Sequence, residues 1–128
     1  MQSYRDLEIY KISHKLAIEI HKMTLDLPKF EMYEEGSQIR RSAKAIPSNI
    51  VEGFGRKKYQ QNYHRFLVIA HASCNETIEH LEILYETESL KNKEKFEYFS
   101  KEYDTLGRKL NKFVQALANS QKPIAQRP

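Results

Sequence analysis

Apolar residues recur at intervals of three and four along most of this 128-residue chain, and that spacing constrains the fold more than any other feature. A helix brings positions three and four apart onto one face, whereas a half-buried strand needs strict alternation. The clearest run lies near the C-terminus and comprises Phe96, Phe99, Tyr103, Leu106, Leu110, Phe113 and Leu117. The spacing therefore predicts an all-α protein.

Three earlier segments show the same spacing. The first runs from Ile9 to Leu27 and stops before Pro28, because the residue before a proline is pushed out of the helical region. The third runs from Tyr59 to Leu84, and residues 88–92 form a short connection to the last. Four such helices predict an antiparallel up-down-up-down four-helix bundle over residues 1–119. We expect the tail, residues 120–128, to be disordered because it has two prolines and few apolar residues.

The second segment carries a proline inside its apolar stripe. The stripe comprises Ile39, Ala43, Ile46 and Ile50. Pro47 lacks an N–H group and crowds the carbonyl four residues earlier, so we predict a kink in helix 2. A break into two short helices is the alternative. We expect Gly53 and Gly55 to end this helix, since glycine tolerates the positive φ of a C-terminal cap.

The formal net charge is +4, and its distribution is uneven. Residues 1–35 have a net charge of −2, and residues 66–128 hold nine basic and nine acidic side chains. Residues 36–65 hold seven Lys and Arg against one acid, Glu52. The seven are Arg40, Arg41, Lys44, Arg56, Lys57, Lys58 and Arg65. Such a concentration predicts an anionic partner, although a solvated face is the common alternative.

Nucleic acid is the commonest partner of this kind, and the seven basic residues are the candidate binding site. Tyr59 and Tyr63 are interleaved with them, and aromatic rings can stack on bases. No helix shows Asn, Gln or Arg at a spacing suited to reading base edges. We therefore expect recognition of shape or phosphate backbone rather than of sequence.

Surplus apolar residues favour self-association. Residues 66–70, FLVIA, are five consecutive apolar positions, so on a helix they cover more than one face. Ile18 and Leu25 likewise lie off the main stripe of the first helix. One bundle core uses one stripe per helix, so we predict a homo-oligomer.

No pattern predicts a metal, a cofactor or a catalytic residue. The Glu-x-x-His pairs of di-iron bundles are absent, and His71 and Cys74 share a helix face without a full ligand set. Arg65 and His71 resemble the Arg-x(4–6)-His motif of HEPN ribonucleases, which makes a metal-independent ribonuclease a weak alternative to a non-enzymatic protein. The single Cys74 excludes an internal disulfide, and no apolar run reaches the roughly 20 residues of a membrane span. We expect a soluble cytoplasmic protein.

Three stretches resemble one known family. The stretches YRDLEIYKISHKLA, SQIRRSAKAIPSNIVEGFGR and RFLVIAHASCNETIEHLE are similar to the 23S rRNA intervening-sequence proteins, some of which are encoded within insertions in bacterial 23S rRNA genes. The resemblance places Arg40, Arg41, Pro47, Gly53 and Gly55 in the family's central motif, and it implies no catalytic residue. It implies an antiparallel four-helix bundle that assembles as a homopentamer.

The similar accessory proteins of diversity-generating retroelements are implicated in binding reverse transcriptase and nucleic acid. This likeness implies an alternative function, a scaffold for a partner enzyme. Within the central motif, we expect Ser48 and Asn49 to bond the carbonyls that Pro47 leaves free, as short polar side chains often do in helices.

Overall fold

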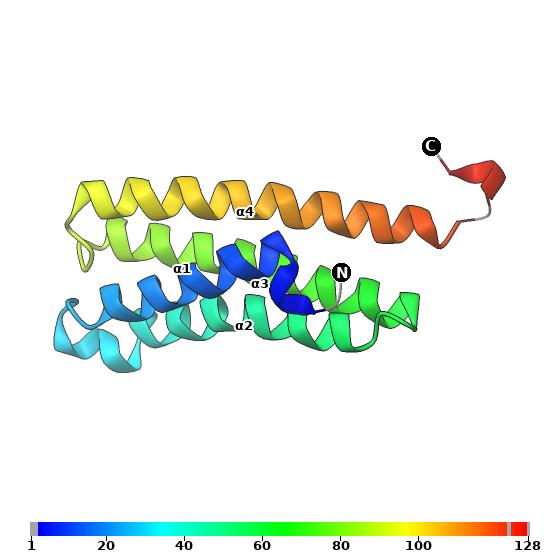
Figure 1. Ribbon diagram of the computed structural model, residues 1–128. Coiled ribbons are helices and arrows are strands. Elements are labelled where there is room, and N and C mark those ends of the chain that lie inside the picture. Colours follow the sequence, from blue (N-terminus) through cyan, green and yellow to red (C-terminus); the bar gives the residue numbers. More distant parts are fainter. Residues whose placement is uncertain (1–2, 123, 128) are drawn as a thin grey trace.

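The chain folds into four helices that lie side by side along a common axis. The computed structural model describes residues 3–122 and 124–127, and over them it confirms the all-α prediction. The helices are α1 (Glu8–Thr24), α2 (Glu35–Gly55), α3 (Gln60–Glu86) and α4 (Lys93–Ser120), with short 3-10 helices at Tyr4–Asp6, Lys29–Tyr33 and Ile124–Gln126. Each helix packs against the next, and α4 contacts α1. Figure 1 shows the α1–α2 and α3–α4 connections at one end and the α2–α3 turn at the other.

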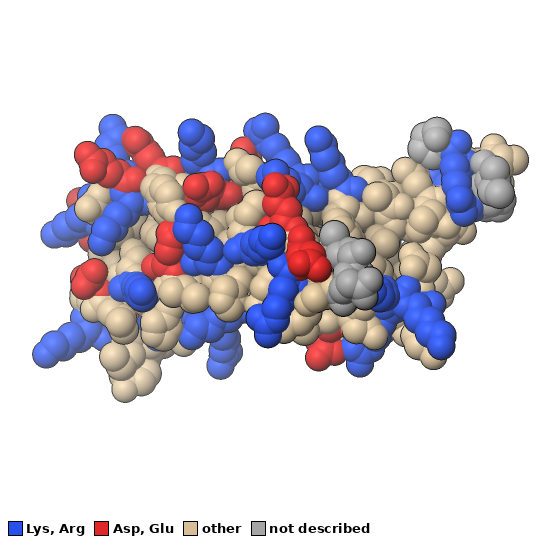
Figure 2. All heavy atoms as spheres, in the orientation of Figure 1, with Lys and Arg blue, Asp and Glu red and all other residues tan. Residues whose placement is uncertain are grey.

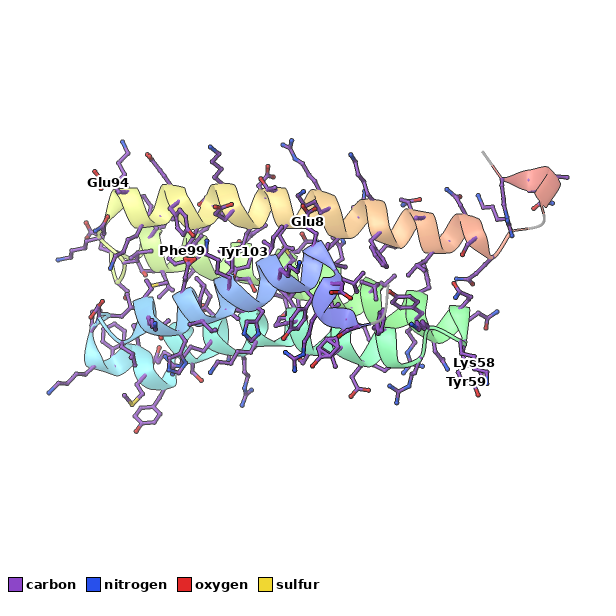
Figure 3. All side chains as sticks on the ribbon, in the orientation of Figure 1. Glu8, Lys58, Tyr59, Glu94, Phe99 and Tyr103 are labelled. Atoms are coloured by element: carbon purple, nitrogen blue, oxygen red, sulfur yellow. The ribbon has the colours of Figure 1, made fainter. Side chains whose placement is uncertain are left out.

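The predicted apolar stripes form the core between the helices. The four stripe residues of α2 are fully buried, as are Cys74 and Leu81 of α3 and Leu106 and Leu110 of α4. Tyr103 is also fully buried, and Figure 3 shows it with Phe99 on the side of α4 that faces the other helices. Burial of each large apolar side chain contributes about 1.5–3 kcal/mol, so these stripes hold the bundle together. None of the described helices is long and apolar enough to cross a membrane.

Helix α2 continues through Pro47 as a single helix. The alternative of two short helices is therefore wrong, whereas the kink stays a prediction. Ser48 Oγ donates to the carbonyl of Lys44 at 3.1 Å, and Asn49 Nδ2 donates to that of Ala45 at 2.8 Å. The carbonyl that a proline leaves free is four residues earlier, at Ala43, so the predicted target of these two side chains was wrong.

The glycines near the end of α2 act by close approach rather than by an unusual backbone conformation. Helix α2 ends at Gly55, as predicted, but Gly53 lies within the helix and no described glycine has a positive φ, so the predicted cap conformation was wrong. Gly53 is buried against α3: a Cβ there would lie 2.8 Å from Leu67 Cδ2 and 3.1 Å from Phe66 Cβ. The missing side chain at Gly53 lets α2 and α3 meet at this point.

The connection between α1 and α2 departs from the expected boundary. Helix α1 ends at Thr24, before Pro28, and the 3-10 helix Lys29–Tyr33 follows. Glu31 is buried, and its carboxylate accepts hydrogen bonds from the backbone N–H of Gly36 at 3.2 Å and from Ser89 Oγ at 2.5 Å. An anionic acceptor near the first N–H groups of α2 stabilises its start.

Helix α4 extends through Ser120, one residue beyond the predicted end of the domain. The proposed disorder of residues 120–128 stays a prediction. Pro123 and Pro128 of that tail lie outside the described residues.

Replacing Gly53 by Ala should destabilise the bundle. The added methyl would collide with Leu67 and Phe66, and overpacking of this kind lowers the free energy of unfolding by about 1–3 kcal/mol. Gly55→Ala is the matched control, because nothing lies within 4 Å of a Cβ at that position. Urea unfolding followed by circular dichroism measures both variants. Equal effects of the two substitutions would contradict the close-approach explanation.

Candidate nucleic-acid interface

The seven basic residues predicted as a binding site fall into two separate groups. Arg40, Arg41 and Lys44 lie in the first half of α2, whereas Arg56, Lys57 and Lys58 directly follow α2 and Arg65 lies in the second turn of α3. With a rise of 1.5 Å per residue, about 22 Å separates Arg41 from Arg56 along the helix axis. The structure therefore does not join the seven into one patch.

Arg40 is committed to contacts within the chain. Its guanidinium donates from Nη1 to Thr24 Oγ1 at 3.0 Å and from Nη2 to the carbonyl of Met32 at 2.6 Å. These bonds tie α2 to the end of α1 and to the 3-10 helix that follows it. A half-buried guanidinium that satisfies two internal acceptors is poorly placed to bind a phosphate.

The other two residues of this group face solvent on α2. Lys44 is exposed, and its Nζ lies 3.0 Å from His21 Nδ1 on α1. Arg41 is exposed and makes no hydrogen bond or ion pair with the described residues. Both side chains are available to an anionic partner.

At the α2–α3 turn, basic side chains gather around aromatic rings. The guanidinium carbons of Arg56 and Arg65 lie 4.9 Å and 5.8 Å from the centroid of the Phe66 ring. Lys57 Nζ lies 4.2 Å from the centroid of the Phe54 ring. All three distances are within the range of cation–π attraction, which holds the cations in place while leaving their outer faces accessible. Arg56 also forms an ion pair with Glu52.

The two tyrosines expected to stack on bases have different environments. Tyr59 is 61% exposed, and Figure 3 shows it with Lys58 at the end of the bundle. Tyr63 is buried in the core, and burial raises the pKa of its hydroxyl to about 12. Only Tyr59 is therefore available for stacking.

A second basic region, missed in the sequence, lies beside this turn. The predicted neutrality of residues 66–128 hides a separation of charge: all nine acids lie within residues 76–104, and residues 105–128 contain none. The side chains of Ser120 and Gln121 bond to Gln60 at 3.4 Å and 3.3 Å, which places the end of α4 against the start of α3. Lys112, Lys122 and Arg127 form no ion pair among the described residues. The guanidinium of Arg127 donates to the carbonyls of Lys122 and Ser120, both at 2.9 Å, but unlike Arg40 this side chain is exposed. In the sequence this region is visible as residues 105–128, which contain no Asp or Glu. Only the packing of α4 against α3 shows that these residues adjoin residues 53–75, which also contain no Asp or Glu.

We call the resulting surface the basic end. It consists of Arg56, Lys57, Lys58, Arg65, Lys112, Lys122 and Arg127. Figure 2 shows few Asp and Glu atoms toward the end that holds the α2–α3 turn, whereas Lys, Arg, Asp and Glu are interspersed over the opposite half. The bundle is therefore electrostatically polarised along its length.

The residues considered for catalysis are not brought together. Arg65 and His71 are six residues apart on α3, so their side chains point about 120° apart around the helix. His71 instead lines a shallow groove between α3 and α4 with Asp104 and Arg108. Burial, with a contribution from Asp104, raises the pKa of the Cys74 thiol to about 12, so the thiol is protonated at neutral pH and is a poor nucleophile. Among the described residues, no group of three or more His, Cys, Asp and Glu could hold a metal ion.

Comparison with known proteins agrees with this architecture. The profile of the 23S rRNA-intervening sequence protein family matches residues 5–112. The chain belongs to this family. A crystal structure of a protein of unknown function from the S23 ribosomal protein family of Bacteroides thetaiotaomicron is 24% identical, with a TM-score of 0.72. That alignment covers 83% of this chain and 97% of the other, and at this identity it supports the fold alone. No curated protein matches the chain.

Membership of the family confirms the resemblance seen in the three sequence stretches. The matched range includes both Arg40 and Arg41, yet the structure gives the two residues different environments. Adjacent positions on a helix point about 100° apart, so one side chain turns inward and its neighbour outward.

Truncation of these two arginines should separate structural from surface roles. Arg40→Ala removes two hydrogen bonds, of which the one to Thr24 Oγ1 is partly buried, and this loss should lower the free energy of unfolding by about 1–3 kcal/mol. Arg41→Ala is the control, and it should change the free energy of unfolding by less than about 0.5 kcal/mol. Thermal and urea unfolding test both variants. A stable Arg40→Ala protein would show that Arg40 is not a structural residue.

Proposed function

We propose that this protein is a non-enzymatic, homo-oligomeric helical bundle that binds nucleic acid, with RNA favoured, through the basic end. The observation that carries the proposal is the gathering of seven Lys and Arg side chains from three segments of the chain, in two stretches that lack Asp and Glu. Two nearby acids are already paired with basic side chains, Glu52 with Arg56 and Glu8, which lies beside Lys112, with Lys109. In a homo-oligomer each copy of the chain would add its own basic end, and the family resemblance favours an assembly of five copies.

The arrangement suits a phosphate backbone. Lys and Arg side chains that neutralise phosphates release condensed counterions, which makes binding favourable and dependent on salt. The exposed ring of Tyr59 lies among these cations and can stack on an unpaired base. Since no helix presents a row of base-reading side chains, the proposed contact recognises backbone and shape.

Family membership supports RNA over DNA. The family is described by its relation to an intervening sequence of 23S rRNA, which suggests an RNA-associated role for its members. Arg56 and Arg65, both held against Phe66, also offer planar groups on which splayed RNA bases can stack.

The scaffold function implied by the retroelement resemblance remains the alternative. It would be favoured by stable capture of a protein in place of RNA. The ribonuclease function has less support because Arg65 and His71 lie on different faces of α3. Cleavage of RNA in EDTA that is lost in His71→Ala would revive it.

Charge reversal at the basic end should weaken RNA binding. Lys57→Glu combined with Lys58→Glu should lower affinity for a structured rRNA fragment by at least about tenfold at low salt and reduce the slope of log affinity against log salt by about two. Fluorescence anisotropy of the labelled fragment in EDTA, across a salt series, gives both quantities.

The matched control places the same change of charge at the opposite end of the bundle. Lys91→Glu combined with Lys93→Glu alters exposed residues at the α3–α4 connection, where acids predominate. This variant should keep at least half of the wild-type affinity. Equal loss in the two double variants would attribute binding to net charge, and absence of binding by the wild-type protein at low salt would refute the proposed function.

A further inference from the structure

Two surfaces on different sides of the bundle are complementary in apolar character and in charge. The first is an apolar groove of about 350 Å³ between α1 and α2, lined by His14, Ala17, Ile18, His21, Lys22, Lys44 and Pro47. Ile18 is 45% exposed there, and Lys22 and Lys44 stand at the rim. We call this surface the groove. Its floor is apolar, and its rim is basic.

The second surface is a stripe along the exposed side of α3. Val68 and Ile69 are 42% and 38% exposed, and Ala72 follows one turn later. The stripe then continues with the exposed acids Glu76, Glu79, Glu82 and Glu86. None of these acids takes part in an ion pair with a described residue. We call this surface the α3 stripe.

We infer that the α3 stripe of one copy docks in the groove of the next copy, so that the chain assembles head to tail. The inference rests on the self-assembly part of the proposed function and specifies which surfaces carry it. The two patches differ, so the contact is heterologous, and heterologous contacts close into rings or propagate as filaments.

Contacts within one chain show the level of each of these residues, that is, its position along the long axis of the bundle. Thr77 Oγ1 of α3 donates to Ser42 Oγ of α2 at 2.8 Å, and the neighbouring α2 residues Arg40 and Lys44 contact Thr24 and His21 of α1. Residues 42, 77 and about 22 therefore lie at one level. At 1.5 Å per residue, Ala72, Ile18 and Pro47 lie together about 7 Å further toward the basic end.

These levels favour a ring over a filament. In a ring, neighbouring copies are related by rotation about an axis parallel to the helices, and this rotation leaves the position of each residue along that axis unchanged. It therefore places Ala72 of one copy at the level of Ile18 and Pro47 of the next. The same rotation places Glu76 at the level of Lys22 and Lys44. Apolar side chains thus meet the apolar floor, and unpaired acids meet the basic rim. A filament with a translation between copies would lose this correspondence.

In such a ring, the basic residues of α2 and those of the basic end would have different roles. Lys44, with Arg41 beside it, would face the acids of a neighbouring copy, whereas the basic ends of all copies would gather on one face of the ring. Several linked binding surfaces on one face raise the avidity for a long polyanion without any new contact. The opposite face would carry the α3–α4 connection and the start of α4, with Glu88, Glu94 and Glu97.

The decisive experiment mixes two variants, each with one damaged surface. Ile18→Asp disrupts the groove and Ile69→Asp disrupts the α3 stripe; both positions are exposed, so the fold should survive, as circular dichroism can verify. In native mass spectrometry without RNA, wild-type protein should be a closed oligomer and each variant alone a monomer. An equimolar mixture should form a one-to-one heterodimer, because one intact groove meets one intact stripe. Tyr33→Asp, at an 85% exposed site outside both surfaces, is the control and should assemble normally.

Charge reversal provides an independent test. Lys22→Glu with Lys44→Glu should shift the protein to monomers, and adding Glu76→Lys with Glu79→Lys to the same chain should restore the oligomer. A monomeric wild-type protein, variants that assemble normally, or a mixture that stays monomeric would overturn the inference. Since RNA is absent, these outcomes leave the RNA-binding proposal intact, and loss of RNA binding in the Lys57 and Lys58 variant leaves the assembly result intact.

Discussion

The close contact between α2 and α3 at Gly53 positions much of the rest of the molecule. A side chain at this position would collide with Leu67 and Phe66, so its absence lets the two helices approach just before the turn that joins them. That approach brings Phe66 beneath the guanidinium groups of Arg56 and Arg65, which come from opposite sides of the turn. A packing constraint in the core thus gives the basic end its local order.

Antiparallel packing then decides where charge accumulates. The acid-free first half of α3 lies against the acid-free second half of α4, whereas the acids of both helices lie together toward the other end. Along the chain these segments alternate and their charges cancel. In the bundle they separate, and a modest net charge becomes a polarised particle with one end suited to phosphate.

The sequence predicted the elements far better than the surface. The spacing of apolar residues identified four helices and their buried stripes, because periodicity directly reports which face avoids water. It did not distinguish Arg40 from Arg41, Tyr59 from Tyr63, or the lysines beside the groove from those at the turn. Each distinction depends on which neighbour a side chain meets, and that neighbour is distant in sequence: Thr24 for Arg40, Phe113 for Tyr63 and His21 for Lys44. The glycines illustrate the same limit, since a glycine needed for close packing and a glycine needed for a cap look alike in sequence.

By itself the sequence determined the helical class, the core stripes, the family motif and the excess of basic residues in residues 36–65. These properties are local, because they depend on residue type and spacing within one or two turns. The tertiary structure alone decided which basic residues are internal, which lie beside the α1–α2 groove and which form the basic end with Lys112, Lys122 and Arg127. These properties depend on the relative position of helices, which is fixed by packing between segments as far apart in the sequence as Glu8 and Lys109, 101 residues.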